Sequence, residues 1–344
     1  SQSKMTLDAK GMAVAPGFID VHTHAENILS QPKGENFLRM GVTTLVLGNC
    51  GSSKLNLADF FIQLSEKGFS PNIASLIGHG TVRKQVMGGS IRRPPTAIEL
   101  IQMQEYIEKG MRDGALGMST GLIYLPGTFA KTEELIALAK TVSAHRGIYV
   151  SHMRSEGSRL LESLDELIRI AHEAGIRAEI YHLKESGKDN WGKYDDVVAK
   201  VDSARAAGLY ITADMYNYVA GATGLDAAMP PWVQEGGYDQ WAERLQDPAI
   251  RKKVKEEMMT PTDEWESLMQ AAGDPSKILL VGFKNDTLKH YTGKTLKEVA
   301  ELRGTSPEET AMDLVVQDGS RVGTIYFLMS EDNVKKQIAL PWMS

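Results

Sequence analysis

The chain has one cysteine, Cys50, among 344 residues, so it cannot form an intramolecular disulfide. A single thiol fits a reducing, cytoplasmic setting. No apolar run approaches the ~20 residues that a membrane-spanning helix needs, and the first residues lack the apolar core of a signal peptide. Acidic residues (44) outnumber basic ones (38), and no basic stripe stands out. Nucleic acids and anionic membranes are therefore not expected partners.

The sequence also lacks a GxGxxG motif after any apolar run, which counts against a dinucleotide-binding fold. Short apolar runs instead alternate with amphipathic stretches. The runs predict strands at 13–22, 43–49, 72–77, 115–119, 148–151, 178–181 and 210–214. Four stretches with apolar residues at i, i+3, i+4 and i+7 predict helices at 97–113, 131–145, 157–174 and 193–207.

Strands separated by single helices are expected to be parallel neighbours, and seven or eight such units favour an α/β fold of the (β/α)8 barrel type. Residues 217–277 are rich in glycine and proline and break this rhythm, which indicates an insertion above the barrel mouth. The rhythm is predicted to resume at 278–283, with helices near 295–302 and 306–317 and an apolar run at 323–329. The last piece, 338–344, resembles the start of another strand.

The segment Gly17-Phe-Ile-Asp-Val-His-Thr-His24 ends an apolar run with two histidines two residues apart. Side chains alternate along a strand, so His22 and His24 are expected on one face at its carboxyl end. Two imidazoles placed in this way form half of a divalent metal site. The pattern alone is a weak signal, and the alternative is a pair of polar residues capping an edge strand.

Later runs end in further candidate ligands, and the active site of such a barrel lies at the carboxyl ends of its strands. Cys50 follows the second run, whereas His152 and His182 end the fifth and sixth. The two histidine segments resemble each other, since Arg154 and Lys184 each follow two residues after the histidine. This repeated spacing predicts a metal site with cations beside it. Such a site suits a substrate that has a carbonyl group for the metal and a separate anionic group for the cations. The alternative is histidines bonded to loop backbone, with surface cations.

Cys50 alone is more often a small buried residue, and a Cys–His nucleophile pair is a further alternative to a metal-bound thiolate. Its position near four histidines at strand ends favours the metal ligand. Tyr124 lies on the loop after the fourth run and either lines the site or packs against Pro126.

At this point the residues resemble the amidohydrolase superfamily, and within it the N-acyl-D-amino-acid deacylases (D-aminoacylases). The resemblance rests on Ala15-Pro-Gly-Phe-Ile-Asp-Val-His-Thr-His24, Gly48-Asn-Cys-Gly-Ser52, Gly78-His-Gly-Thr81, Gly114-Ala-Leu-Gly-Met-Ser-Thr-Gly-Leu-Ile-Tyr124, Ser151-His-Met-Arg154 and His182-Leu-Lys184. It implies a barrel that hydrolyses the amide bond of N-acyl-D-amino acids with one or two zinc ions.

The resemblance also implies roles for individual residues. The zinc ligands are expected to be His22, His24, Cys50, His152 and His182. The α-carboxylate of a small-molecule substrate is expected to contact Tyr124, Lys184 and Tyr216, and the repeated spacing described above adds Arg154. Nothing in the sequence specifies the oligomeric state.

The sequence departs from the family pattern at both ends. Only 21 residues precede His22, fewer than the family has for its small β-domain, and the family's catalytic aspartate is expected beyond Ser344. Residues 1–344 are therefore expected to be a barrel truncated at both ends. Two alternatives stay open: a cyclic-amide hydrolase of the hydantoinase or dihydroorotase kind, and a catalytically inactive metal-binding barrel. The first is disfavoured because no lysine follows the fourth run before Lys131.

Overall fold

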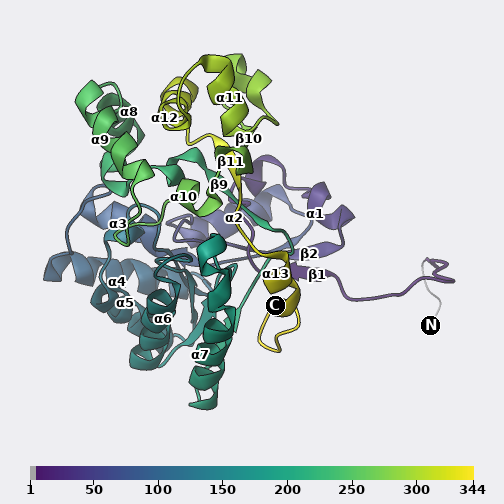
Figure 1. Cartoon of the computed structure of the whole chain (residues 1–344). Coiled ribbons are helices and arrows are strands. Elements are labelled where there is room, and N and C mark those ends of the chain that lie inside the picture. The colour runs from purple at the N-terminus through teal and green to yellow at the C-terminus, as the bar shows by residue number, and fades with distance from the viewer. Residues whose placement is uncertain (1–4) are drawn as a thin grey trace.

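The computed structural model describes residues 5–344, and its core is a run of parallel strands in sequence order (Figure 1). One sheet contains β1 (Phe18–Asp20), β2 (Val42–Leu47) and β3 (Asn72–Ser75). The next contains β4 (Ile77–Gly78), β5 (Gly117–Gly121), β6 (Ile148–His152), β7 (Arg177–Ile180) and β8 (Ile211–Ala213). Only Leu76 separates β3 from β4, and Met343 forms a parallel bridge to Ala213 of β8. This is the predicted (β/α)8 barrel order.

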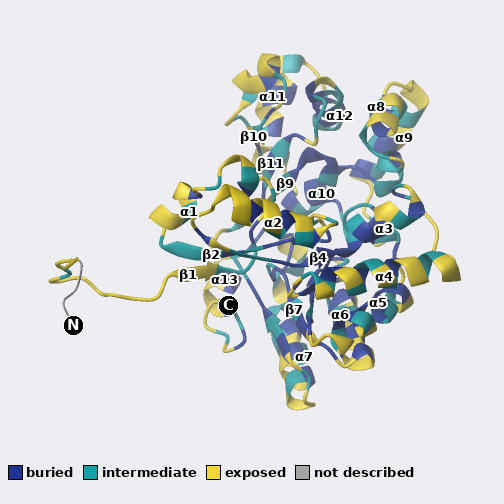
Figure 2. Cartoon of the chain, turned by 180° about the vertical axis from the view of Figure 1, so that it is seen from behind, coloured by how far each residue is buried: buried dark blue, intermediate teal, exposed yellow. Residues whose placement is uncertain are grey.

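The helices that follow these strands cover the outside of the barrel: α2 (Leu57–Lys67), α3 (His79–Met87), α4 (Ala97–Arg112), α5 (Thr132–Ala144), α6 (Leu160–Ala174) and α7 (Tyr194–Ala206). Their apolar faces and the outward side chains of β5 to β8 form the largest core cluster, and Figure 2 shows the opposite faces of α4 to α6 exposed. The four helices predicted from periodicity are confirmed, with ends shifted by at most three residues.

The insertion is longer than the predicted 217–277. Strands β9 (Ala220–Gly224), β10 (Ile278–Gly282) and β11 (Gly323–Phe327) form a separate antiparallel sheet in the order β10-β11-β9. Its helices are α8 (Tyr238–Arg244), α9 (Pro248–Met259), α10 (Leu268–Ala272), α11 (Leu296–Arg303) and α12 (Pro307–Asp318), and the unit, here called the inserted lobe, has its own core. The assignment of 278–283 and 323–329 to the barrel was therefore wrong, because an apolar run does not reveal which strand it pairs with.

The remaining elements are short. They are α1 (Glu35–Arg39), α13 (Glu331–Gln337) and the 3-10 helices at Ile28–Ser30, Gly127–Phe129, Lys188–Lys193, Leu225–Ala228, Pro231–Gln234, Pro275–Lys277 and Asp286–Tyr291. The last segment, 338–344, forms turns and the single bridge at Met343 rather than a regular strand. No helix within residues 5–344 is both long and apolar enough to cross a bilayer.

Candidate metal centre

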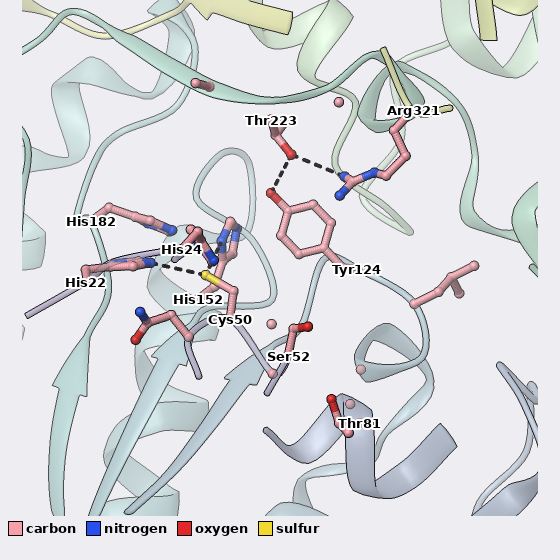
Figure 3. Close-up of a pocket in the computed structure, with 18 of the residues that line it drawn as sticks. His22, His24, Cys50, Ser52, Thr81, Tyr124, His152, His182, Thr223 and Arg321 are labelled. Carbon is pink, nitrogen blue, oxygen red and sulfur yellow. Dashed lines mark hydrogen bonds between the residues drawn. The ribbon is translucent and has the colours of Figure 1, made fainter. Parts of the chain in front are cut away.

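The strand ends bring all five predicted ligands together at the barrel mouth (Figure 3). Their ligand atoms form two groups, each within 4.8 Å, which share one residue: His22, His24 and Cys50 in the first, and Cys50, His152 and His182 in the second. Two neighbouring metal positions with a common thiolate fit this arrangement, and so does a single ion at either one.

The distances around Cys50 suit a bound metal. Its Sγ atom lies 3.4 Å from Nε2 of His22 and 3.9 Å from Nδ1 of His152. In a tetrahedral zinc site with bonds of about 2.0–2.3 Å, ligand atoms lie about 3.5 Å apart. The protein therefore presents sulfur and nitrogen donors at the separation that zinc requires.

Backbone conformation marks the same positions. Cys50 has φ 49° and His182 has φ 35°, in the left-handed region that non-glycine residues rarely occupy. Such conformations persist where the surrounding structure enforces them, and they cluster at functional sites. Gly48, which leads into the Cys50 turn, has φ 79°, and a Cβ atom there would lie 2.2 Å from the carbonyl oxygen of Leu76. Only glycine fits this position.

Asn49, the residue before Cys50, links three segments of the site through its side-chain hydrogen bonds. Its side-chain amide donates to the carbonyl oxygens of Thr23 (2.8 Å) and Val46 (2.9 Å), and its Oδ1 accepts a hydrogen bond from the hydroxyl of Tyr181. These contacts tie the histidine segment after β1 to the turn that carries Cys50. Asn49 is buried and holds the ligands in place without being one.

Asp214, at the end of β8, orients two of the histidines. Its Oδ2 lies 3.2 Å from Nδ1 of His22, so Nε2 of that ring is left to face Cys50. The other carboxylate oxygen accepts the backbone N–H of His182. A carboxylate that accepts the second N–H of a ligand histidine is the usual support of a metal site. The strand-end position of Asp214 was visible in the sequence, but its partner was not.

We expect Asp214→Asn to lower metal affinity about 10–100-fold, because the amide can no longer hold His22 in the required tautomer. Competition with a chromogenic chelator measures this affinity. Asp202→Asn is a matched control, since that carboxylate bonds to Trp342 away from the site. An affinity equal to that of the unchanged protein would contradict the orienting role.

Lys184 is buried and is not among the residues that line the cavity at the ligands, so its predicted substrate contact stays a prediction. Its ammonium group is buried and lies 2.6 Å from Oε1 of Glu156 and 2.9 Å from Nδ1 of His182. The same Glu156 oxygen is 2.9 Å from that histidine nitrogen. Lys184 and Glu156 therefore form a buried ion pair directly behind a candidate ligand. The sequence predicted no role for Glu156.

Arg154 does not line the cavity at the ligands, although it borders a second cavity of about 310 Å³. Its guanidinium group forms two 2.9 Å hydrogen bonds to the carboxylate of Glu166 on α6 and donates to the carbonyl oxygens of Thr128 and Ala130. The prediction extended strand alternation past His152, where β6 ends. Beyond that point the backbone turns, and the period of two no longer determines where a side chain lies.

Burial shifts the protonation equilibria of the ligands. It lowers the pKa of His152 and of His182 well below the ordinary value, and nearby positive charges add to the effect at His182. Both rings are thus neutral, the form that binds metals. Burial, followed by the carboxylates of Asp214 and Glu156, raises the pKa of the Cys50 thiol. A metal ion must therefore displace a proton to bind this sulfur.

This requirement predicts the reactivity of Cys50. In zinc-loaded protein the thiol should resist alkylation by iodoacetamide. After a chelator removes the ion it should react, slowly near neutral pH and faster as the pH rises, because its raised pKa leaves little thiolate. Mass spectrometry of the only cysteine gives the extent of reaction directly. Protection that persists unchanged after chelation would mean that burial, and not a metal, shields the sulfur.

The ligands lie in a cavity of about 1860 Å³ between the barrel and the inserted lobe. Tyr124 and Tyr216, both predicted substrate contacts, line its wall. The hydroxyl of Tyr124 is 3.0 Å from Oγ1 of Thr223 on β9, and its ring packs edge-on against His152 with centroids 5.0 Å apart. Arg321, from the segment between α12 and β11, completes this wall, and nothing in the sequence singled it out.

Known proteins resemble this chain over nearly its whole length. A curated D-aminoacylase of Alcaligenes xylosoxydans xylosoxydans is 31% identical over 361 residues, which cover 97% of this chain and 63% of that protein. The structure of N-acyl-D-glutamate deacylase from Bordetella bronchiseptica, complexed with zinc and a phosphonate inhibitor, aligns with a TM-score of 0.77 and 26% identity over 95% of this chain and 64% of that one.

A D-aminoacylase structure described by its binuclear metal centre aligns with a TM-score of 0.74 and 28% identity, over 95% of this chain and 64% of that one. The chain thus spans less than two thirds of the length of these relatives. The model of the amidohydrolase family matches residues 5–325, and the chain belongs to the amidohydrolase family.

Proposed function

We propose that this chain carries the metal centre of an enzyme that hydrolyses the amide bond of N-acyl-D-amino acids, releasing a D-amino acid and a carboxylate. The observation that carries the proposal is the pair of ligand groups that share Cys50 at the floor of a large cavity. The curated relative with 31% identity is a D-aminoacylase, and further relatives act on N-acyl-D-glutamate and N-acyl-D-aspartate.

The cofactor we propose is Zn²⁺, as one or two ions. Sulfur and neutral imidazole donors are the ligands that zinc prefers in proteins, and the deacylase of Bordetella bronchiseptica was determined with zinc. Bound there, the ion supplies Lewis-acid polarisation of a carbonyl and lowers the pKa of water to about 7.

The side chains around the ions would position the substrate. Tyr124 and Tyr216 offer hydroxyl groups on the cavity wall. Asp214, Glu156 and Lys184 act on the ligands His22 and His182 from behind. The general base stays a prediction: the resemblance implies an aspartate after Ser344, and Asp214 is already engaged by His22 and His182.

The test is an assay of two zinc-loaded proteins, this chain and a form extended past Ser344 to include the expected aspartate. The substrates are N-acetyl-D-leucine, N-acetyl-L-leucine and dihydrouracil, and amino-group release or ring opening is followed. Turnover of the D-compound that stops on chelation and returns with zinc is the expected result. Preferential ring opening would support a cyclic-amide hydrolase, which lacks support in the structure because no lysine lies within β5. Stoichiometric zinc without any turnover would support the inactive metal-binding barrel.

A further inference from the structure

Arg321 places a positive charge in the cavity wall from the inserted lobe, opposite the metal ligands (Figure 3). Its Nε donates to Oδ2 of Asp226 at 2.8 Å, and its Nη2 donates to Oγ1 of Thr223 at 3.2 Å. The guanidinium carbon lies 5.3 Å from the centroid of the Tyr124 ring. These contacts hold the side chain in one orientation, although 53% of its side-chain surface stays accessible to solvent.

The guanidinium group keeps free hydrogen-bonding capacity. Arginine has five N–H donors, and within residues 5–344 only two of those of Arg321 have protein partners. The remaining donors lie on the two Nη atoms, the edge that binds a carboxylate through two parallel hydrogen bonds. The ion pair with Asp226 does not require that Arg321 also line the cavity, so its position there points to a second role.

The distance from the metal centre suits a substrate. Two contacts connect them: 5.0 Å from the His152 ring to the Tyr124 ring, and 5.3 Å from that ring to the arginine. In an N-acyl amino acid only two bonds of about 1.5 Å and one of about 1.3 Å separate the scissile carbonyl carbon from the α-carboxylate carbon. A carbonyl group at the ligands therefore brings a carboxylate of the same molecule within reach of this arginine.

The other nearby cations are less suited to this task. Lys184 is sequestered by Glu156 and does not line the cavity. Lys84 lines the cavity from α3, but within residues 5–344 no hydrogen bond or ion pair fixes its ammonium group. Arg321 also borders a second cavity of about 310 Å³, which it shares with Tyr124. Arg321 thus lines both the main cavity and this second cavity, here called the side pocket.

We propose that Arg321 is a specificity-determining residue that binds a carboxylate of the substrate from the inserted lobe. The inference rests on the proposed function, and it assigns the guanidinium group of Arg321 as the group that binds the anionic part of the substrate. The carboxylate is either the α-carboxylate or that of an acidic side chain, because Arg321 lines both the main cavity and the side pocket.

The experiment is calorimetric binding to the zinc-loaded protein and its Arg321→Gln variant, with kcat and KM measured in parallel. The probes are N-acetyl-D-leucine, its α-carboxamide and N-acetyl-D-glutamate. We expect the variant to lose about 10–100-fold in affinity for the carboxylates, as for a hydrogen-bonded charge pair, and to bind the carboxamide as before. The loss should appear in KM more than in kcat.

Two further variants separate binding from structure. Asp226→Asn removes the partner of Arg321 but leaves its charge, so carboxylate affinity should stay the same or rise. If the arginine served only to hold the lobe through this ion pair, Asp226→Asn would weaken binding as much as Arg321→Gln. Lys84→Gln, a second cation of the same cavity, is the matched charge control and should change affinity less than Arg321→Gln.

The outcomes distinguish the sources of the carboxylate and the two proposals. A loss with both N-acetyl-D-leucine and N-acetyl-D-glutamate assigns the α-carboxylate, and a loss with N-acetyl-D-glutamate alone assigns the side chain. An equal loss with the carboxamide, or no loss at all, would overturn the role of Arg321 while turnover still supports the deacylase. Arginine-dependent binding without turnover of any probe, by a protein that includes the expected aspartate, would retain this inference and reject the proposed function.

Discussion

A His22→Ala/His24→Ala variant is expected to lose its metal position, with an affinity decrease of more than about 100-fold. The two substitutions remove two of the three donors in the group that ends with Cys50. Replacing even a residue that only orients a ligand costs about 10–100-fold in affinity, so the loss of two ligands must exceed that. Elemental analysis after zinc loading and dialysis measures the remaining metal, and amide hydrolysis should fall with it.

The matched control is His145→Ala/His172→Ala, which removes two histidines from the outer helices. His145 ends α5 and His172 lies in the last turn of α6, both exposed. This variant should keep its zinc and its activity. Circular dichroism should report a folded barrel in both proteins. Unchanged zinc content in the His22→Ala/His24→Ala variant would show that the group Cys50, His152 and His182 alone holds the ion.

The positions of the ligands could be predicted because they depend on local rules. Short apolar runs predicted the strands. Because the carboxyl ends of the strands lie at one edge of a parallel barrel, polar residues at those ends were expected to lie close together. This reasoning placed His22, Cys50 and His152 at one site from segments separated by 28 and 102 residues, and the geometry agrees.

The rest of the site depends on contacts that no local rule specifies. Arg154 and Lys184 share a sequence pattern, yet one pairs with Glu166 on α6 and the other with Glu156. Both cations follow the end of a strand, where side-chain alternation stops. Arg321 reaches the cavity from the inserted lobe, whose sheet joins β9 to β11 across 98 residues. The pairing of β9 with β11 depends on the packing of the whole lobe, and it cannot be predicted from an apolar run in the sequence.

The buried ion pair behind His182 leads to the second large expected effect. Lys184→Met should destabilise the protein by about 3–5 kcal/mol, because it leaves the carboxylate of Glu156 buried without its cation. The residues Lys184 and Glu156 are 4% and 3% exposed, so water cannot compensate for the loss. The midpoint of urea unfolding, at constant zinc concentration, measures the change.

The companion variant Glu156→Gln/Lys184→Met tests the reason for this loss. It removes both charges and keeps the side-chain volumes similar, and such replacements of buried ion pairs are often neutral or stabilising. Most of the lost stability should therefore return, whereas zinc affinity should not, because glutamine no longer gives the carboxylate that lies 2.9 Å from Nδ1 of His182. Equal destabilisation in both variants would mean that packing, and not the unpaired charge, dominates. Full zinc affinity in the double variant would show that Glu156 serves the fold alone and that His182 is oriented by the backbone bond to Asp214.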